Sequence, residues 1–141
     1  MQQKGMVWVI GASGGLGRAT AQAFAQNGWS VIAGARSFAA GTSPLGEGVT
    51  VLPLDVTSEE SCTAFVKKAL GMESRVDVLV CAAAQLVLGS CENTTVDELD
   101  RLLDVNVLGA VRMIQRALPL MRAQKSGKII LFSSINGLLG I

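Results

Sequence analysis

The chain has 141 residues, of which half are apolar and 16% are charged, and its net charge is +1. This length fits a single domain over residues 1–141, and the scattered charges and few aromatic residues exclude a typical nucleic-acid surface. No apolar run is long enough to cross a bilayer, and the run before the first glycines is too short for a secretory signal, so no membrane association is expected.

The first third of the chain predicts a strand, a helix and a second strand. Residues 6–10 form an apolar run bounded by glycine, which favours a short strand. Residues 16–28 show helical spacing, and Gly28 is a typical residue for ending a helix. The apolar face of this helix is predicted to consist of Leu16, Ala19, Ala23 and Phe24. A second strand follows at 30–36, and then a loop rich in Gly, Ser and Pro at 37–48.

The middle of the chain repeats this alternation of strand and helix. Residues 49–56 form a third apolar run that predicts a strand. The spacing of Thr57 and Glu60 is that of a capping box, which predicts a helix from there to about residue 70. Residues 75–83 predict a fourth strand.

The last part of the chain predicts a long helix and a fifth strand. Thr95 and Glu98 again have capping-box spacing, and the following residues favour a helix, in one piece or two, to about residue 123. Residues 127–134 predict the last strand. Strands that alternate with helices, and that are continuous apolar runs, indicate a parallel sheet covered on both faces. We therefore predict a Rossmann-like doubly wound α/β fold with strand order 3-2-1-4-5, which leaves the fifth strand at an edge.

A cluster of glycines follows the first predicted strand and opens the first predicted helix. Gly11, Gly14, Gly15 and Gly17 lie in the sequence VIGASGGLGRA. Glycines at such a junction permit a tight turn and let the backbone approach a pyrophosphate, while the helix amino terminus offers free N–H groups. The cluster predicts dinucleotide binding, and the lack of a Gly-Lys-Ser/Thr sequence excludes a P-loop. The alternative is a glycine-rich turn that packs on the sheet and binds nothing.

The end of the second strand bears on which dinucleotide binds. A cofactor with a free ribose 2′-hydroxyl favours an acidic residue there, but this chain has Ala35 followed by Arg36. A guanidinium suits phosphate oxygens, so NADP(H) is preferred, with NAD(H) possible. Asp55 ends the third strand, where it either lies beside an adenine or is a loop acid at the following helix start.

These residues resemble the short-chain dehydrogenase/reductase family, and the resemblance extends over the whole chain. The family's Thr-Gly-x-x-x-Gly-x-Gly motif falls on residues 10–17, with Ile10 in place of Thr. Asp55 matches the family's adenine-contacting Asp, and the family's Asn-Asn-Ala-Gly segment is replaced by Cys-Ala-Ala-Ala at 81–84. The resemblance implies cofactor contacts from Gly11, Ser13, Gly15, Leu16, Gly17, Arg36, Asp55, Val56, Ala82, Ala83 and Ala84.

The resemblance also implies catalytic roles for two residues. Asn106, in the sequence VNVLG, corresponds to the family's active-site Asn, which would hold water for a proton relay from a kink in the long helix. Ser134 corresponds to the family's Ser, which would donate a hydrogen bond to the substrate oxygen. The family's acid/base Tyr and its Lys would follow Ile141, and the chain contains no Tyr. We therefore expect an N-terminal part of a longer enzyme, incomplete as a domain and inactive by itself.

The expected activity of the full-length protein is hydride transfer between NADP(H) and a small-molecule ketone or secondary alcohol, by a homo-oligomer, dimer or tetramer. The alternative is a non-catalytic dinucleotide-binding sensor or scaffold, which the missing Tyr and the Cys-Ala-Ala-Ala segment would fit. A methyltransferase on a similar fold is disfavoured because its cofactor ribose also favours an acid after the second strand.

The cysteines bear on metal binding and on location. Cys62, Cys81 and Cys91 form no CxxC pair, and the chain has no histidine. Because zinc sites use closely spaced ligands of these two types, no metal is expected. Reduced thiols are usual in the cytoplasm, which is the predicted location.

Overall fold

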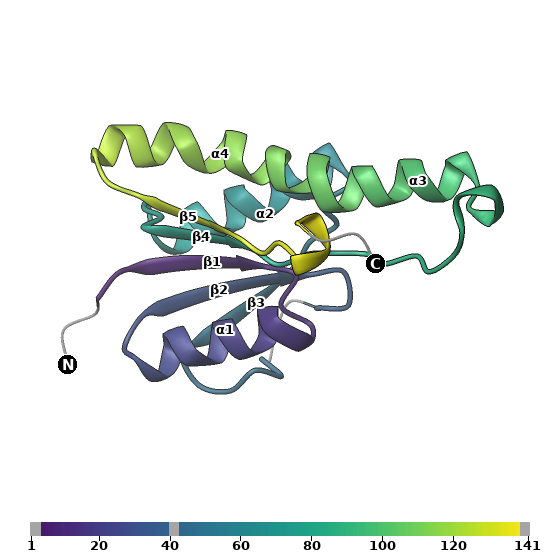
Figure 1. Cartoon of the computed structure of the whole chain (residues 1–141). Coiled ribbons are helices and arrows are strands. Elements are labelled where there is room, and N and C mark those ends of the chain that lie inside the picture. The colour runs from purple at the N-terminus through teal and green to yellow at the C-terminus, as the bar shows by residue number, and fades with distance from the viewer. Residues whose placement is uncertain (1–3, 40–42, 139–141) are drawn as a thin grey trace.

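The fold is a parallel sheet of five strands with helices on both faces. The computed structural model describes residues 4–39 and 43–138, so three residues of the predicted 37–48 loop lie outside the described residues. The strand order is β3-β2-β1-β4-β5, with every neighbouring pair parallel, which confirms the predicted order (Figure 1). The strands are β1 (Met6–Ile10), β2 (Ser30–Ala35), β3 (Val49–Pro53), β4 (Val78–Cys81) and β5 (Lys128–Leu131).

The central strand β1 divides the core into two halves because successive side chains point to opposite faces. Trp8 and Ile10 belong to the cluster on one face, where the Trp8 ring meets Phe65 edge-on. Val7 and Val9 belong to the cluster on the other face. All of β1 is buried, as the continuous apolar run predicts for a doubly covered parallel strand.

The helices cover these two faces unequally. The α1 helix (Gly15–Gln26) covers the face of Val7 and Val9, whereas α2 (Glu59–Met72) and α4 (Gly109–Gln124) cover the face of Trp8 (Figure 1). Gly28 follows α1 with a φ of 80°, a left-handed conformation that suits glycine at a helix end.

The predicted apolar face of α1 was wrong. Leu16, Ala19 and Ala23 are exposed, and the residues that are buried are Gly17 and Ala21. Phe24 does pack against the core. The start of α1 lies so close to the glycine turn that a Cβ on Gly17 would lie 2.2 Å from the Gly11 oxygen; Gly17 therefore faces inward, and the adjacent Leu16 faces solvent.

The long predicted helix is continuous but not regular. It consists of α3 (Val96–Leu103), a π-helical segment (Asp104–Leu108) and α4. The capping box of Thr95 and Glu98 is present, as predicted. Short 3₁₀ turns lie at Cys91–Asn93 and Ile135–Gly137.

Several strands end earlier in the structure than the sequence predicts, and one helix begins at a different capping residue. β3 ends at Pro53 instead of residue 56 because the chain turns there, and the cap of α2 is Ser58, whose hydroxyl accepts from the Ser61 N–H. Thr57 instead donates its hydroxyl to Asp55. The residues just beyond these strand ends, among them Arg36, Val56 and Ala82, line the cavities described below. Among the residues that the structure describes, no helix combines the length and apolar character needed to span a membrane.

Asp77 joins the start of β4 to β1, and we expect its ionised carboxylate to stabilise the fold. Its Oδ2 accepts from the Met6 N–H at 2.8 Å and from Arg75 Nε at 2.9 Å. Burial raises the pKa of the Asp77 carboxyl, but the hydrogen bonds from Arg75 and Met6 outweigh it and leave that pKa below its ordinary value. The stabilisation is therefore present above the unfolded-state pKa and is lost as the pH falls through the folded-state pKa.

We expect Asp77→Ala to lower the free energy of unfolding at pH 7 by about 2 kcal/mol, because it leaves the Met6 N–H without its acceptor. The difference from the wild type should narrow at pH 3, because that pH lies below the ordinary pKa of a carboxyl group and the stabilisation is lost as the pH falls toward the lowered folded-state pKa. Urea unfolding at both pH values measures this, with Asp100→Ala as a control on an exposed carboxylate of α3. An equal loss at both pH values would contradict the charge-dependent part of this explanation.

Candidate functional site

Two adjoining cavities lie where the parallel strands end. The first, of about 290 Å³, lies over the carboxyl ends of β1, β2 and β3. The second, of about 550 Å³, lies between the amino terminus of α1 and the exit of β5. Both cavities share the residues Gly14 and Ala82–Gln85 as a common wall. Open α/β sheets bind their ligands in this crevice at the carboxyl ends of the strands.

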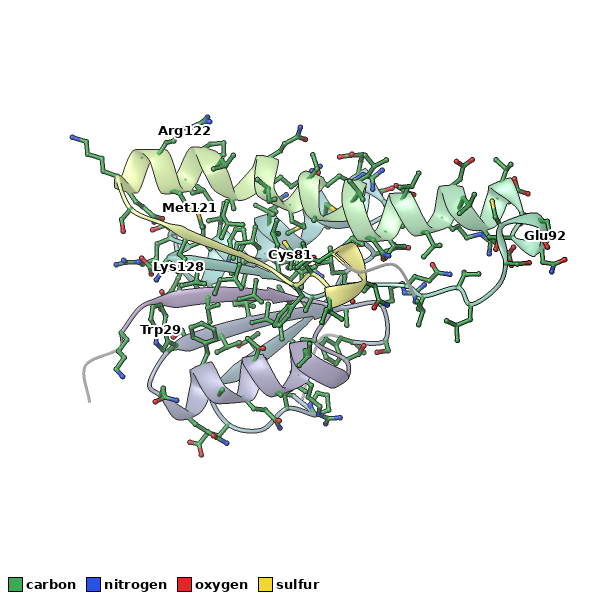
Figure 2. The ribbon with its side chains drawn as sticks, viewed as in Figure 1. Trp29, Cys81, Glu92, Met121, Arg122 and Lys128 are labelled. Atoms are coloured by element: carbon green, nitrogen blue, oxygen red, sulfur yellow. The ribbon has the colours of Figure 1, made fainter. Side chains whose placement is uncertain are left out.

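The structure brings the residues singled out in the sequence together around these two cavities. The first is lined by Gly11, Ser13, Arg36, Asp55 and Val56, and the second by Gly15, Leu16, Gly17, Asn106 and Ser134, with Ala82, Ala83 and Ala84 in both. Figure 2 shows Cys81, which immediately precedes this wall, at the end of the sheet away from Trp29 and Lys128.

The glycine turn is packed so tightly that two of its glycines are required. A Cβ on Gly11, whose φ is 85°, would lie 2.3 Å from the Ala83 nitrogen, and a Cβ on Gly17 would lie 2.2 Å from the Gly11 oxygen. The amino terminus of α1 begins after Gly14 with no side-chain cap. Its first N–H groups and the positive end of the helix dipole are therefore available to an anion.

A cation and two hydroxyls gather at one end of the first cavity. Arg36, Ser13 and Ser37 line a shallow pocket that shares Ser13 and Arg36 with the first cavity, and its lining includes no carboxylate among the residues that the structure describes. Ser37 was missed in the sequence, although it directly follows Arg36. A guanidinium with neighbouring hydroxyls is an arrangement that suits phosphate oxygens.

Asp55 has a structural role in its turn as well as a place at the cavity. Its Oδ1 accepts from the Thr57 N–H at 2.9 Å and from the Thr57 hydroxyl at 2.7 Å. These hydrogen bonds lower the pKa of Asp55, and the charge of Arg36 adds a smaller effect in the same direction. Asp55 is therefore ionised at neutral pH and shapes the turn into α2. This is compatible with both interpretations of Asp55, as a residue beside an adenine and as a loop acid at the helix start.

Asn106 lies in the π-helical segment, and its side chain forms two hydrogen bonds with the loop that follows β4. Its Oδ1 accepts from the Gln85 N–H at 2.7 Å, and its Nδ2 donates to the Gln85 oxygen at 2.9 Å. The side-chain amide is thus engaged at both ends by one backbone residue. The expected water-holding role stays a prediction, because the observed contacts instead fix the shared wall of the two cavities. Gln85 carried no signal in the sequence, since its contact to Asn106 is made by its backbone.

The small residues after β4 form a smooth wall. Cys81 is buried, and burial raises the pKa of its thiol to about 11, so it is neutral at physiological pH and not a nucleophile. Ala82, Ala83 and Ala84 follow and line both cavities. The methyl side chains of these three alanines permit close approach of a flat ligand but offer it no hydrogen bonds.

Ser134 follows β5 and faces the second cavity together with Phe132 and Ser133. Its hydroxyl oxygen accepts from the Asn136 N–H at 3.2 Å and caps the 3₁₀ turn that begins at Ile135. Because an accepting hydroxyl retains its own proton, Ser134 can still donate a hydrogen bond into the cavity. The structure thus brings a hydroxyl donor and the glycine turn to one cavity.

Comparison with known proteins agrees with this fold. The model of the short chain dehydrogenase family matches residues 5–141. A 3-ketodihydrosphingosine reductase of Bacteroides thetaiotaomicron is 34% identical over 99% of this chain and 50% of its own length. An estradiol 17-beta-dehydrogenase 1 of Rattus norvegicus is 42% identical over 64% of this chain and 26% of its own length.

A solved structure leads to the same assignment. A short-chain dehydrogenase from Streptomyces avermitilis is 34% identical, with a TM-score of 0.86, over 96% of this chain and 51% of its own. The chain therefore spans half or less of the length of the two curated relatives above and about half of this solved structure. Because the family match extends over nearly the whole chain and agrees with the observed sheet, the chain belongs to the short chain dehydrogenase family.

Proposed function

We propose that the natural full-length protein is an NADP(H)-dependent oxidoreductase acting on a small-molecule ketone or secondary alcohol. The observation that carries this proposal is the meeting of Ser134 and the open amino terminus of α1 at the second cavity, which shares a wall with the first cavity. A dinucleotide lying across both would bring its nicotinamide to Ser134. When bound, this cofactor supplies or accepts the hydride.

Different segments of the chain would bind different parts of the cofactor and the substrate. The N–H groups at the start of α1 would hold the pyrophosphate, and the Asp55–Val56 turn would border the adenine. Ala83 and its neighbours would let the cofactor lie close to the sheet. Ser134 would donate a hydrogen bond to the substrate oxygen, where negative charge develops as the carbonyl is reduced. Asn106 would keep the wall between the cavities in place.

The preference for NADP(H) rests on the cluster of Arg36, Ser13 and Ser37. A 2′-phosphate here would meet one cation and two hydroxyls, whereas none of these three residues offers a carboxylate to a free 2′-hydroxyl. Location in the cytoplasm stays a prediction from the cysteines.

We also propose that the full-length protein is a homo-oligomer. Leu99, Leu103 and Val107 lie along one side of α3 and the π-helical segment, and they are 43%, 56% and 50% exposed. A continuous apolar stripe of this kind is typical of a helix that packs against another helix. Sedimentation of the full-length protein tests this, and a monomer at micromolar concentration would contradict it.

The cofactor assignment is tested by titrating NADPH and NADH into the wild type and into Arg36→Ala. We expect the substitution to weaken NADPH binding by about tenfold or more, since it removes a charge-assisted contact to phosphate, and to leave NADH binding unchanged. Arg122→Ala is the matched control, because Arg122 lies at the far end of α4 (Figure 2). Unchanged NADPH binding would overturn the role of Arg36, and binding without turnover in the full-length protein would favour the non-catalytic sensor or scaffold.

A further inference from the structure

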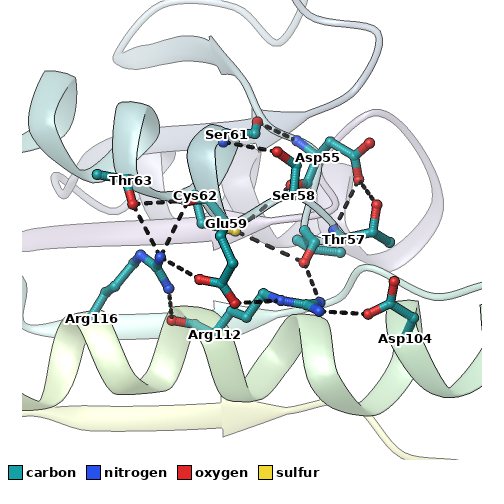
Figure 3. A network of polar contacts seen from close by, with 11 residues as sticks. Asp55, Thr57, Ser58, Glu59, Ser61, Cys62, Thr63, Asp104, Arg112 and Arg116 are labelled. Carbon is teal, nitrogen blue, oxygen red and sulfur yellow. Dashed lines mark hydrogen bonds and ion pairs between the residues drawn. The ribbon is translucent and has the colours of Figure 1, made fainter.

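Arg112 makes three polar contacts from α4 to three separate parts of the fold (Figure 3). Its Nη1 donates to the Val56 oxygen at 2.9 Å, and its Nε donates to Glu59 Oε1 at 2.8 Å. Its Nη2 lies 2.7 Å from Asp104 Oδ1, a buried oxygen, in an ion pair whose geometry is not that of a good hydrogen bond. The Arg112 side chain is only 16% exposed.

The three partners of Arg112 belong to the turn at the first cavity, to the start of α2 and to the π-helical segment. Val56 lines the first cavity beside Asp55, and Glu59 is the first residue of α2. Asp104 begins the π-helical segment that carries Asn106. One guanidinium therefore connects the turn at the adenine side of the candidate site to the segment that clamps the wall between the two cavities.

The packing around Val56 shows that this connection is close. A Cβ on Gly109 would lie 2.6 Å from Val56 Cγ2, so the backbone of α4 packs directly against the Val56 side chain. On the other side of the turn, the Cys62 thiol contacts the Val56 oxygen at 3.9 Å. The Val56 carbonyl is thus held between α2 and α4, and Arg112 provides its charged hydrogen bond, which is stronger than a neutral one.

We propose that Arg112 is a positioning residue for the cofactor, which sets the Asp55–Val56 turn and fixes it relative to the π-helical segment. Arg112 touches neither cavity, so it acts through the turn. This inference rests on the proposed binding of a dinucleotide along the first cavity. A planar guanidinium is needed because a lysine ammonium cannot meet three partners in this fixed arrangement.

Arg116 offers a matched comparison one turn further along α4. It bonds Glu59 Oε2 at 2.7 Å and Thr63 Oγ1 at 3.1 Å, and its Nη1 donates to the Arg112 oxygen at 3.0 Å. It shares Glu59 with Arg112 and has a similar exposure, 21%. The contacts found for it among the described residues do not include Val56 or Asp104. Loss of Arg116 should therefore weaken the packing of α2 against α4 without releasing the turn.

The test compares Arg112→Met, Arg112→Lys and Arg116→Met in the natural full-length protein. The probes are NADPH, adenosine 2′,5′-bisphosphate for the adenosine half and nicotinamide mononucleotide for the other half. We expect Arg112→Met to weaken NADPH and the bisphosphate by about tenfold and to leave the mononucleotide unchanged. Arg112→Lys should recover only part of this loss, and Arg116→Met should change each dissociation constant less than about twofold.

A second measurement separates positioning from general destabilisation and needs no ligand. Hydrogen exchange at the Thr57 and Ser58 amides should become about tenfold faster in Arg112→Met and stay unchanged in Arg116→Met. If Arg112→Met does not fold, Arg112→Lys should still show the faster exchange. Equal effects of the Arg112 and Arg116 variants on the bisphosphate or on exchange would overturn the inference. A wild type that binds no NADPH would instead refute the proposed function, and the exchange result would still decide whether Arg112 holds the turn.

Discussion

Gly17→Ala is expected to weaken NADPH binding by about a hundredfold or more, the largest effect on binding that the structure supports. A Cβ at this position would lie 2.2 Å from the Gly11 oxygen and 2.9 Å from the Gly11 carbonyl carbon. Because the obstacle is backbone, no side chain can rotate away, and α1 must shift outward. That shift moves the helix amino terminus, whose N–H groups would hold the pyrophosphate. Calorimetric titration of NADPH measures the change.

The same substitution should also lower the free energy of unfolding by about 1–3 kcal/mol, as overpacking of a well-packed site does. Gly71→Ala is the control, because it lies in α2 with open space around it and should leave stability the same or slightly higher. If Gly17→Ala bound NADPH as the wild type does, the glycine turn would not be the pyrophosphate site.

Ser134→Ala is expected to reduce kcat of the full-length protein by about a hundredfold or more, with a smaller change in KM. Removing one preorganised donor to a developing oxyanion has effects of this size in other enzymes. Steady-state kinetics with NADPH and a ketone substrate measure it. Because Ser134 lies exposed after the edge strand and its hydroxyl caps only a short 3₁₀ turn, the substitution should lower the free energy of unfolding by no more than about 1 kcal/mol.

Ser133→Ala is the matched comparison for this prediction. Ser133 adjoins Ser134 and lines the same cavity, but only the Ser134 hydroxyl caps the following 3₁₀ turn. We expect the Ser133 variant to retain most of its activity. A larger loss of kcat from Ser133→Ala than from Ser134→Ala would show that the alignment of the active-site serine is off by one residue.

The sheet could be predicted from the sequence because its signals are local and repeated. Each strand is a short apolar run, and every connection except the 37–48 loop carries a helical pattern, so this alternation indicates a parallel sheet. The strand ends could not be predicted in the same way. Val56 and Ala82 continue the apolar runs although they line a cavity, and an apolar residue at a cavity wall has the same sequence signature as one inside a strand.

The contacts that shape the site could not be predicted from the sequence for a different reason. Asn106 meets the backbone of Gln85, and Arg112 meets the carbonyl of Val56, at sequence separations of 21 and 56 residues. A backbone partner leaves no trace in residue type. Leu16 illustrates the opposite error, because its apolar side chain suggests burial while the close approach of Gly17 to the turn directs it to the surface.

In the proposed complex a dinucleotide lies along the carboxyl ends of the strands, with its pyrophosphate at α1 and its adenosine at the Asp55–Val56 turn. Amide chemical shifts measured by NMR during titration of the protein with NADPH test it most directly. We expect saturable shifts at Leu16 and Gly17 together with Val56, and little change at the opposite end of the sheet near Trp29. Saturable shifts confined to other surfaces, or no saturation at millimolar NADPH, would contradict it.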